Sequence, residues 1–452
     1  MEDQEKTSEK YYTVFERYVD SMYKIDGYYT IRYDTLIGKW FRYEDGYYHQ
    51  ITIQSIYQIF IEAMLVNGLA ESTTKMNYCI KKLEALTQFD GHWDDNSPAI
   101  DNVLNGIVNL ETRELEDHHP SYMFKYQVRR KYNPAVDRVI PTLYNEVLQC
   151  IPNPKQREYF NNFFLHVIHK NFDDEVFLML YGVKGAGKST LIQIFTEMYG
   201  PQMTSKTGLQ KLGGRFGKTD MYDKRINAEP DLPIVDLNPY VISELKKLTG
   251  EDGYLEVELK NKDPFKYLIS CFLVFGINQL MGFNQDAEKE IDSIMRRVIL
   301  VECPTMMPKN AEFKKKIRDP EFLDELYSWG VITPPLLMYE PEEEEEWIRQ
   351  NKELWLLNSD PILRICREEF EYCPPEIIQE ESGIEIPLIQ SIRIMEVITT
   401  VSECLEEEGQ IIPKHTDIQT LITRSLKTMK ILKNTRHGKN AAYENIVRRA
   451  EP

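Results

Sequence analysis

Residues 175–200 have the sequence EVFLMLYGVKGAGKSTLIQIFTEMYG, which carries the strongest signal in the chain. The spacing G-x-x-x-x-G-K-[ST] of a phosphate-binding loop, or P-loop, runs from Gly182 to Ser189. The apolar run Val176–Tyr181 predicts a buried strand before this loop, and Ser189–Met198 predicts a helix after it, closed by Gly200. A strand, a glycine-rich loop and a helix in this order predict a nucleotide site.

Each residue type in the loop suits phosphate chemistry. Glycines let backbone N–H groups wrap a phosphate, and the helix N-terminus adds positive potential. Lys188 is expected to reach the β- and γ-phosphates, and Ser189 is expected to hold Mg²⁺. We therefore expect ATP and Mg²⁺ as cofactors. The expected nucleotide-binding residues are Gly182, Val183, Lys184, Gly185, Ala186, Gly187, Lys188, Ser189 and Thr190.

Two polar residues downstream follow strand-like runs. Glu229 ends a short, weakly hydrophobic run and is the candidate for activating water and, with Ser189, for supporting the metal; a surface acid is the alternative. Only one acid stands there, where a pair is usual. Asn278 ends the strongly apolar run 271–278, and an amide at the carboxyl end of a central strand can orient the attacking water. Read alone, it would be a turn residue.

An arginine pair, Arg296 and Arg297, precedes the predicted strand Val298–Val301. Such a pair can be salt-bridged structure, or it can reach the γ-phosphate held by a neighbouring subunit and neutralise transition-state charge. A finger acting between subunits implies a ring. We favour Arg297 over Arg296 as this catalytic residue.

The composition limits the class of protein. The 452 residues include 54 Lys and Arg against 72 Asp and Glu, a net charge of −18, and 42% are hydrophobic, which excludes wholesale disorder. Residues 411–452 are locally basic, at +6. The longest apolar-looking run, Leu268–Ile277, is too short to span a membrane, and the charged N-terminus lacks a secretory signal. Seven scattered cysteines fit reduced thiols, so we expect a cytoplasmic protein whose mature chain starts at Met1.

Taken together, five motifs resemble the superfamily 3 helicases of the AAA+ class, and most closely the C-terminal helicase module of phage, plasmid and poxvirus primase-helicases. They are GVKGAGKST (182–190), the strand ending at Glu229, LKKLTGEDGYLEV (245–257), VFGINQL (274–280) and SIMRRVILVEC (293–303). The segment 105–134, beginning NGIVNLETREL, is similar to one that these proteins carry before the ATPase. The resemblance covers roughly residues 30 to 330. No primase domain is visible, so any primase or polymerase is expected to be a separate chain.

The resemblance implies a ring, expected to be a hexamer, that translocates on single-stranded DNA. The hairpin that grips DNA would be Glu256–Phe265, and its tip would present Lys260, Asn261 and Lys262; an ordinary solvated turn is the alternative. Near the C-terminus, two helical patterns precede a Gly-turned basic hairpin, the order of a winged helix. Its duplex-binding candidates are Lys430, Lys433, Arg436 and Lys439, although a basic packing domain would look the same.

The expected fold class is α/β, with an AAA+ P-loop ATPase core. The expected divisions are an α/β N-terminal domain (1–105), a collar and helical lead-in (106–170), the core (171–305), a helical segment with acidic linker (306–375) and a winged-helix-like domain (376–452). The expected function is an ATP-dependent DNA helicase that unwinds forked DNA during replication of a mobile or viral element. The alternative is a DNA-binding initiator or recruitment platform that uses ATP binding as an assembly switch.

Overall fold

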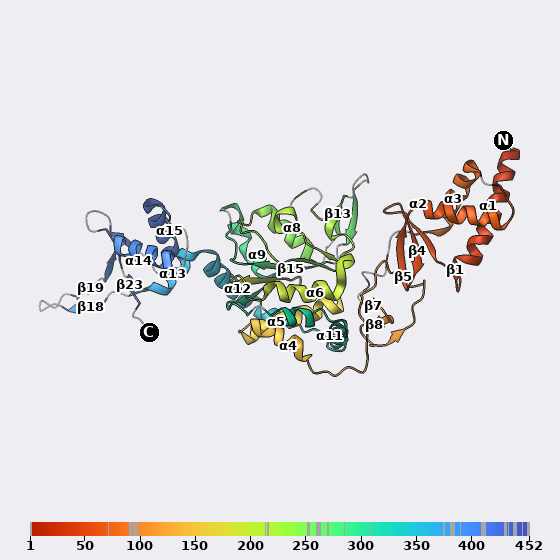
Figure 1. Ribbon diagram of the computed structural model, residues 1–452. Helices are drawn as coiled ribbons and strands as arrows, with labels where there is room; N and C mark the ends of the chain where they lie inside the picture. The colour runs from red at the N-terminus through yellow and green to blue at the C-terminus, as the bar shows by residue number, and fades with distance from the viewer. Residues whose placement is uncertain are drawn as a thin grey trace. The chain divides into compact units, whose positions relative to one another are not determined.

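The structure is a computed structural model of mixed α/β type with a parallel sheet (Figure 1). It describes residues 2–449 except 71, 90–92, 94–96, 98, 213, 215–216, 251–253, 259–263, 269–270, 284, 309, 374–375, 380–384, 389, 408–412, 429–431, 433, 437–440 and 445. The chain divides into two compact units, one of Met1–Pro233, Asn238–Asn278 and Arg296–Glu344 and one of Ile234–Leu237, Gln279–Met295 and Glu345–Pro452. No helix in the part described is both long and apolar enough to cross a membrane.

The N-terminal part of the first unit packs three helices with a small sheet. The helices are α1 (Glu2–Met22), α2 (Ile53–Val66) and α3 (Thr73–Thr87). The sheet has the order β5-β4-β3-β6, and the strands here are β1 (Lys24–Ile25), β2 (Tyr28–Tyr29), β3 (Ile31–Asp34), β4 (Lys39–Glu44), β5 (Tyr47–Ile51) and β6 (Gln88–Phe89). Thr52 caps α2 by accepting a hydrogen bond from the Ser55 amide, and Phe15 and Phe60 meet edge to face in the core.

The collar comes next and is a small antiparallel sheet. Its strands are β7 (Ile100–Val103), β8 (Gly106–Asn109) and β9 (Leu115–Glu116). Two helices and a 3-10 turn follow, α4 (Thr142–Val147), η2 (Leu148–Cys150) and α5 (Pro154–His169). Asn153 caps α5 by accepting hydrogen bonds from the amides of Lys155 and Gln156, so the helix starts at Pro154, after three residues that follow η2.

A five-stranded parallel sheet forms the centre of the first unit. Its order is β11-β12-β15-β10-β16, and the strands are β10 (Phe177–Gly182), β11 (Thr204–Ser205), β12 (Ile226–Glu229), β15 (Phe272–Ile277) and β16 (Val298–Cys303). The interior of β10 and all of β15 are buried, as expected for a parallel sheet covered on both faces. The predicted strand, loop and helix at residues 175–200 are all present.

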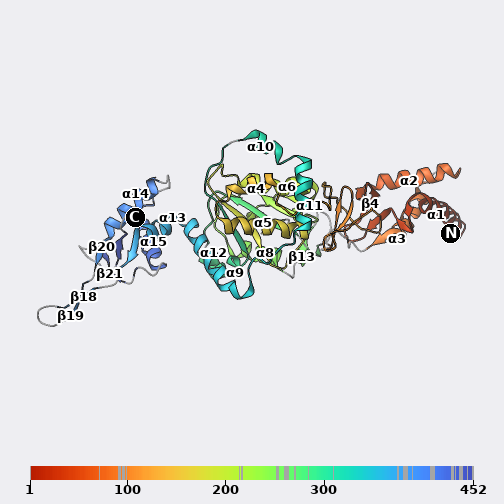
Figure 2. The same ribbon diagram turned by 90° about the horizontal axis from the view of Figure 1, so that it is seen from below.

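Helices cover this sheet on both faces because right-handed crossovers leave in opposite directions from β10 and β12. Figure 1 shows α6 (Lys188–Met203) and α5 on one face and α8 (Pro239–Thr249) on the other, and Figure 2 views the molecule from the α5 and α6 side. Gly200 has φ of 70°, so the helix that starts at Lys188 kinks where the sequence predicted its end. The remaining elements of the first unit here are α7 (Leu209–Leu212), η3 (Thr219–Met221), β13 (Tyr254–Val257), β14 (Phe265–Leu268), α10 (Ala311–Lys316) and α11 (Pro320–Ile332). The segment Gln279–Met295 of the second unit contains η4 (Gln285–Glu290) and α9 (Ile291–Met295).

The described C-terminal part contains four α-helices, one 3-10 turn and several short strands. Its elements are η5 (Pro341–Glu343), α12 (Glu344–Ser359), α13 (Pro361–Glu369), β17 (Phe370–Tyr372), β18 (Glu376–Gln379), β19 (Glu385–Leu388), β20 (Ser391–Arg393), α14 (Ile394–Glu407), α15 (His415–Thr428), β21 (Asn434–Arg436), β22 (Ala442–Glu444) and β23 (Ile446–Arg448). One sheet has the order β20-β22-β21. Its hydrophobic core includes Ile362 and Cys366 of α13, so packing begins upstream of residue 376.

Candidate functional site

The loop between β10 and α6 adopts a backbone that only glycine accepts easily. Gly182, Gly185 and Gly187 have φ of 133°, 84° and 95°, in the left-handed half of conformational space. A Cβ on Gly182 would lie 2.1 Å from the carbonyl oxygen of Cys303, so this position also lacks the space for a side chain. The loop therefore follows β16 closely and delivers the chain to the first turn of α6, where the orphan amides and the helix dipole favour an anion.

Lys188 points back over the loop. Its Nζ donates hydrogen bonds to the carbonyl oxygens of Gly182 (2.6 Å) and Val183 (2.9 Å) and to Asn278 Oδ1 (3.1 Å). The side chain is buried, and burial lowers its pKa, while Cys303 and Asp231 act in the opposite direction. The ammonium group thus sits at the centre of the candidate site, held by neutral oxygens that a phosphate could replace.

The other loop residues divide between the surface and the interior. Val183, Lys184, Gly185 and Ser189 are exposed, whereas Ala186 is buried. Gly182, Gly187 and Thr190 are intermediate. The exposed residues form the outer face of the loop, on the side that a ligand would approach.

The carboxyl ends of β12 and β15 bring Glu229 and Asn278 to the same edge of the sheet as the loop. Glu229 pairs in register with Phe275, and Asn278 follows the last residue of β15. Because parallel strands end at one edge, both side chains lie beside the residues that follow β10. The hydrogen bond between Asn278 and Lys188 joins two of the three predicted catalytic residues at this edge.

Asp231 is a residue that the sequence analysis did not identify. It is exposed and close enough to Lys188 to act on its charge, and its backbone N–H lies 3.4 Å from Glu229 Oε1. The chain turns here because Gly276 lets Pro230 approach: a Cβ on Gly276 would lie 2.5 Å from the Pro230 carbonyl oxygen. The triplet Glu-Pro-Asp at 229–231 could have identified Asp231 in the sequence, since it supplies a second acid two positions after the strand.

The oxygen donors at this edge fit a magnesium ion. Ser189, Glu229 and Asp231 offer a hydroxyl and two carboxylates, and Mg²⁺ is usually held by one or two carboxylates together with substrate phosphates. Among the described residues, no cluster of three or more His, Cys, Asp or Glu side chains forms a cage for a metal ion. A metal at this edge would therefore depend on a bound nucleotide for its remaining ligands.

Arg296 and Arg297 lie at the opposite edge of the sheet, because they precede β16. Both donate to Glu175 Oε2, at 3.0 Å and 2.6 Å, and Arg296 also pairs with Glu344 at 3.5 Å. The Arg296 side chain is 38% exposed and that of Arg297 is 10% exposed. Burial and the neighbouring Arg296 lower the pKa of Arg297, while Glu175 raises it. Neither arginine lies at the loop edge of its own chain.

A β-hairpin occupies the position predicted for the DNA-binding hairpin. Strands β13 and β14 pair antiparallel, with Val257 opposite Phe265. The hairpin is fixed to the segment before β12 at two points. Near its base, Tyr267 Oη donates to Asp223 Oδ1 at 2.7 Å, and beyond the end of β13 the Glu258 carbonyl accepts from Thr219 Oγ1 at 2.8 Å.

Most of the predicted DNA-binding residues lie outside the described part of the chain. These are Lys260, Asn261 and Lys262 at the hairpin tip and Lys430, Lys433 and Lys439 near the C-terminus. For Arg436 the structure describes only its place in β21, where it pairs with Ala442.

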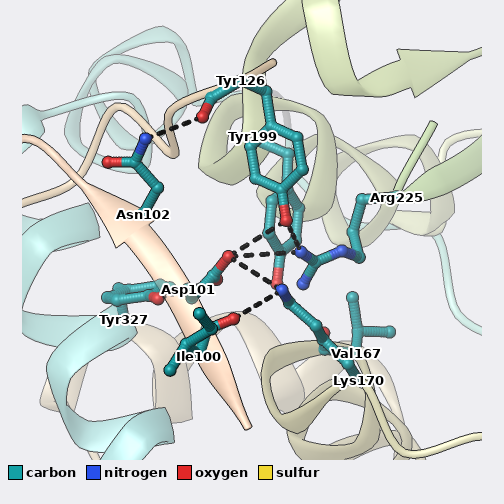
Figure 3. A network of polar contacts seen from close by, with 9 residues as sticks. All are labelled: Ile100, Asp101, Asn102, Tyr126, Val167, Lys170, Tyr199, Arg225 and Tyr327. Atoms are coloured by element: carbon teal, nitrogen blue, oxygen red, sulfur yellow. Dashed lines mark hydrogen bonds and ion pairs between the residues drawn. The ribbon is translucent and has the colours of Figure 1, made fainter. Parts of the chain in front are cut away.

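A buried polar network joins the collar to the core (Figure 3). Asp101 of β7 is fully buried; its Oδ1 lies 3.2 Å from Arg225 Nη2 and 3.4 Å from Lys170 Nζ. Tyr126 and Tyr327 donate to the same carboxylate at 3.1 Å and 2.9 Å. Burial alone would raise the pKa of Asp101, but the two cations and the tyrosines outweigh it, and the pKa is lowered. Because Arg225 directly precedes β12, the network holds the strand that ends at Glu229.

Two family models match parts of the chain. Residues 15–164 match a family described as D5 N terminal like, and residues 180–297 match a family of unknown function, DUF5906. No curated protein matches the chain. Among solved structures, the apo C-terminal region of NrS-1 is similar at 13% identity, with a TM-score of 0.47, over 92% of this chain and 95% of that one. The A form of the same region gives a TM-score of 0.45 with the same identity and coverage.

Proposed function

We propose that the chain is an ATP-dependent DNA helicase that assembles as a ring on single-stranded DNA. The observation that carries the proposal is the strand order β11-β12-β15-β10-β16, with the glycine-rich loop after β10, Glu229 after β12 and Asn278 after β15. This arrangement supports the AAA+ core that the sequence resemblance implies. The matched segments 15–164 and 180–297 include most of the motifs on which the resemblance to superfamily 3 helicases rests.

The residues at the loop edge have separate roles in the proposed reaction. Lys188 leaves its carbonyl partners and binds the β- and γ-phosphates of ATP. Glu229 accepts the proton of the attacking water, and Asn278 orients that water from the neighbouring strand. Ser189, Glu229 and Asp231 would hold Mg²⁺, which neutralises developing charge on the phosphates.

The arginine pair makes the proposed site depend on a second copy of the chain. Arg296 and Arg297 lie at the edge of the sheet remote from Lys188, so they can meet a phosphate only on another subunit. The greater exposure of Arg296 makes it at least as suitable as Arg297 for this contact. A site built from the loop of one subunit and an arginine of the next requires a head-to-tail contact, which builds either a closed ring or an open filament. A hexameric ring is the proposed form.

Two elements are proposed to contact DNA. The first is the hairpin β13–β14, whose tip residues Lys260, Asn261 and Lys262 would follow the phosphates of a single strand. The second is the C-terminal module, where the helix and strand sequence α13, β20, α14, α15, β21, β22 and the order β20-β22-β21 support a winged helix. Its candidates for duplex phosphate are Lys430, Lys433, Arg436 and Lys439.

A forked-duplex assay tests the helicase proposal. We expect the wild-type chain with ATP to release the labelled strand, and a non-hydrolysable analogue to stop release. Lys188→Ala should abolish ATP turnover, and Lys260→Ala/Lys262→Ala should keep turnover while losing strand release. Release by the lysine double variant at the wild-type rate would exclude the hairpin from the mechanism. DNA binding without any release would instead support the initiator or platform that uses ATP as an assembly switch.

Mixing two inactive variants tests the shared site. Lys188→Ala lacks the loop lysine, and Arg296→Ala/Arg297→Ala lacks both candidate fingers. In a mixed ring, some interfaces pair an intact loop with an intact arginine, so we expect part of the ATPase activity to return on mixing. The double arginine variant should still bind ATP. No recovery in mixtures that electron micrographs show to be rings would refute an arginine acting between subunits.

A further inference from the structure

Two exposed methionines lie beside the glycine-rich loop. Met306 and Met307 belong to the segment that follows β16, and they are 71% and 36% exposed. Pro304 directly follows the strand, where it has no N–H to donate to a sheet ladder, and Pro308 follows the methionine pair. Neither methionine has a role in the phosphate chemistry proposed above.

The backbone fixes this segment to the loop. Cys303, the last residue of β16, is in ladder register with Gly182, the first glycine of the loop. Four residues further on, the Met307 amide donates a hydrogen bond to the Gly185 carbonyl oxygen at 3.0 Å. The methionine pair is therefore held at a set position along the loop by hydrogen bonds of the main chain.

The methionine side chains also reach the loop. A Cβ on Gly185 would lie 3.4 Å from Met306 Cγ, and a Cβ on Gly187 would lie 3.8 Å from Met307 Cγ. These are ordinary van der Waals distances, and Gly187 directly precedes the first residue of α6. Each side chain nevertheless keeps more than a third of its surface open to solvent. Uncovered apolar surface thus borders the place where the helix N-terminus favours an anion.

The chemistry of the pair suits a flat aromatic ring. A nucleotide whose phosphates are bound by the loop must place its base beside the loop, because the loop amides are used by phosphate. Methionine is unbranched, and its polarizable thioether makes favourable contacts with aromatic rings. Two flexible thioether side chains can lie flat against a ring, and the contact removes exposed apolar surface from water.

We propose that Met306 and Met307 form the base-binding surface of the nucleotide site and stack on the purine ring of ATP. The inference rests on the proposed function, since it takes the phosphates to be held by the loop and Lys188. A purine has two fused rings, so it makes more dispersion contacts with the two thioethers than a pyrimidine does. The pair therefore favours purine nucleotides, whereas the loop binds the phosphates that all nucleoside triphosphates share.

Calorimetry with three unlabelled ligands tests this surface on the full chain. The ligands are ATP, UTP and inorganic tripolyphosphate, each with Mg²⁺, and tripolyphosphate has the phosphates without a base. We expect the wild type to bind ATP more tightly than UTP. Met306→Ala/Met307→Ala should bind ATP about tenfold more weakly, because two sulfur–ring contacts are lost, and should bind tripolyphosphate as the wild type does.

Two further variants are controls. Met306→Leu/Met307→Leu keeps an apolar surface, so it should lose less ATP affinity than the alanine double variant. Met22→Ala removes a methionine of α1 that is 62% exposed, and it should bind all three ligands as the wild type does. A loss of ATP affinity in Met22→Ala equal to that of the alanine double variant would overturn the inference.

The outcomes separate this inference from the proposed function. If the wild type binds neither ATP nor tripolyphosphate, the proposed function fails and the inference fails with it. If the wild type binds both but the alanine double variant binds ATP as tightly, the base-binding surface is refuted and the nucleotide site stands. Equal weakening of ATP and tripolyphosphate would also refute it, because the methionines would then only support the loop. Loss of ring assembly in electron micrographs at unchanged ATP affinity would assign the pair to a contact with a second copy and likewise refute it.

Discussion

Replacing Asp101 by asparagine should destabilise the first unit strongly. The carboxylate lies within 3.4 Å of Lys170 and Arg225, and both cations are 5% exposed. Asparagine keeps the shape and one acceptor oxygen but removes the only negative charge drawn in this network (Figure 3). Two buried cations then lack a counter-ion, while Tyr126 and Tyr327 must share the remaining acceptor.

The expected loss follows from the cost of an unpaired buried charge. Removing one partner of a buried ion pair costs about 3–5 kcal/mol, and the amide retains part of the hydrogen bonding, so we expect a loss of about 3 kcal/mol. This would be a large share of the roughly 5–15 kcal/mol by which domains are stable. Urea unfolding followed by tryptophan fluorescence gives the free energy of unfolding. Asp20→Asn is the control, because Asp20 makes an exposed ion pair with Lys24 and should be close to wild type.

A loss below about 1 kcal/mol in Asp101→Asn would contradict a stabilising buried ion pair, since that is the range of exposed pairs. An equal loss in Asp20→Asn would also contradict it, because burial would then make no difference. Hydrogen exchange at residues 226–229 gives a second reading. Faster exchange in Asp101→Asn is expected there, because Arg225 anchors the start of β12.

Three further outcomes are expected. The pKa of Asp101 is lowered from 3.8 in the folded protein. The contribution of this carboxylate to the free energy of unfolding should therefore be complete above about pH 3.8 and be lost as the pH falls through the folded-state pKa. Stability should consequently fall less steeply with acid in Asp101→Asn than in the wild type. Gly182→Ala should abolish binding of a fluorescent ATP analogue, because its Cβ would lie 2.1 Å from a carbonyl oxygen. Gly200→Ala is the control, since Gly200 has φ of 70° but open space around it. This variant should lose about 1–2 kcal/mol of unfolding free energy in urea and still bind the analogue. Tyr267→Phe removes a 2.7 Å hydrogen bond to Asp223, so it should lower the free energy of unfolding by about 0.5–1.5 kcal/mol. It should also reduce strand release more than ATP turnover. An equal reduction of both activities would contradict a link through the hairpin base.

The part of the site that could be predicted depends on local pattern. Residues 175–200 contain an apolar strand, a glycine-rich loop with Lys188, and a helix, so this part of the site could be predicted locally. The backbone conformation of the loop follows from the steric limits on φ, which glycine escapes. Glu229 and Asn278 could be predicted to share an edge because parallel strands end on the same side of a sheet. The order of those strands in the sheet could not be predicted from the hydrophobic runs, because it depends on the direction in which each helical connection crosses the sheet.

What could not be predicted depends on contacts between distant segments. Asp101 stands just before the predicted collar (106–170), where a lone acid reads as an ordinary strand or turn residue, and its partners Lys170 and Arg225 come from other elements. Asp231 was missed for a different reason: its approach to Lys188 depends on the turn that Gly276 permits on the neighbouring strand.

The hairpin is joined in the sequence to the strand that ends beside the glycine-rich loop. It is inserted between β12 and β15, and β15 begins shortly after β14 ends at Leu268. The six residues of β15 span about 20 Å in extended conformation. The strand ends next to Asn278, which accepts a hydrogen bond from the Lys188 ammonium. A force on the hairpin would therefore be transmitted along β15 to Asn278, beside the loop that follows the neighbouring strand β10.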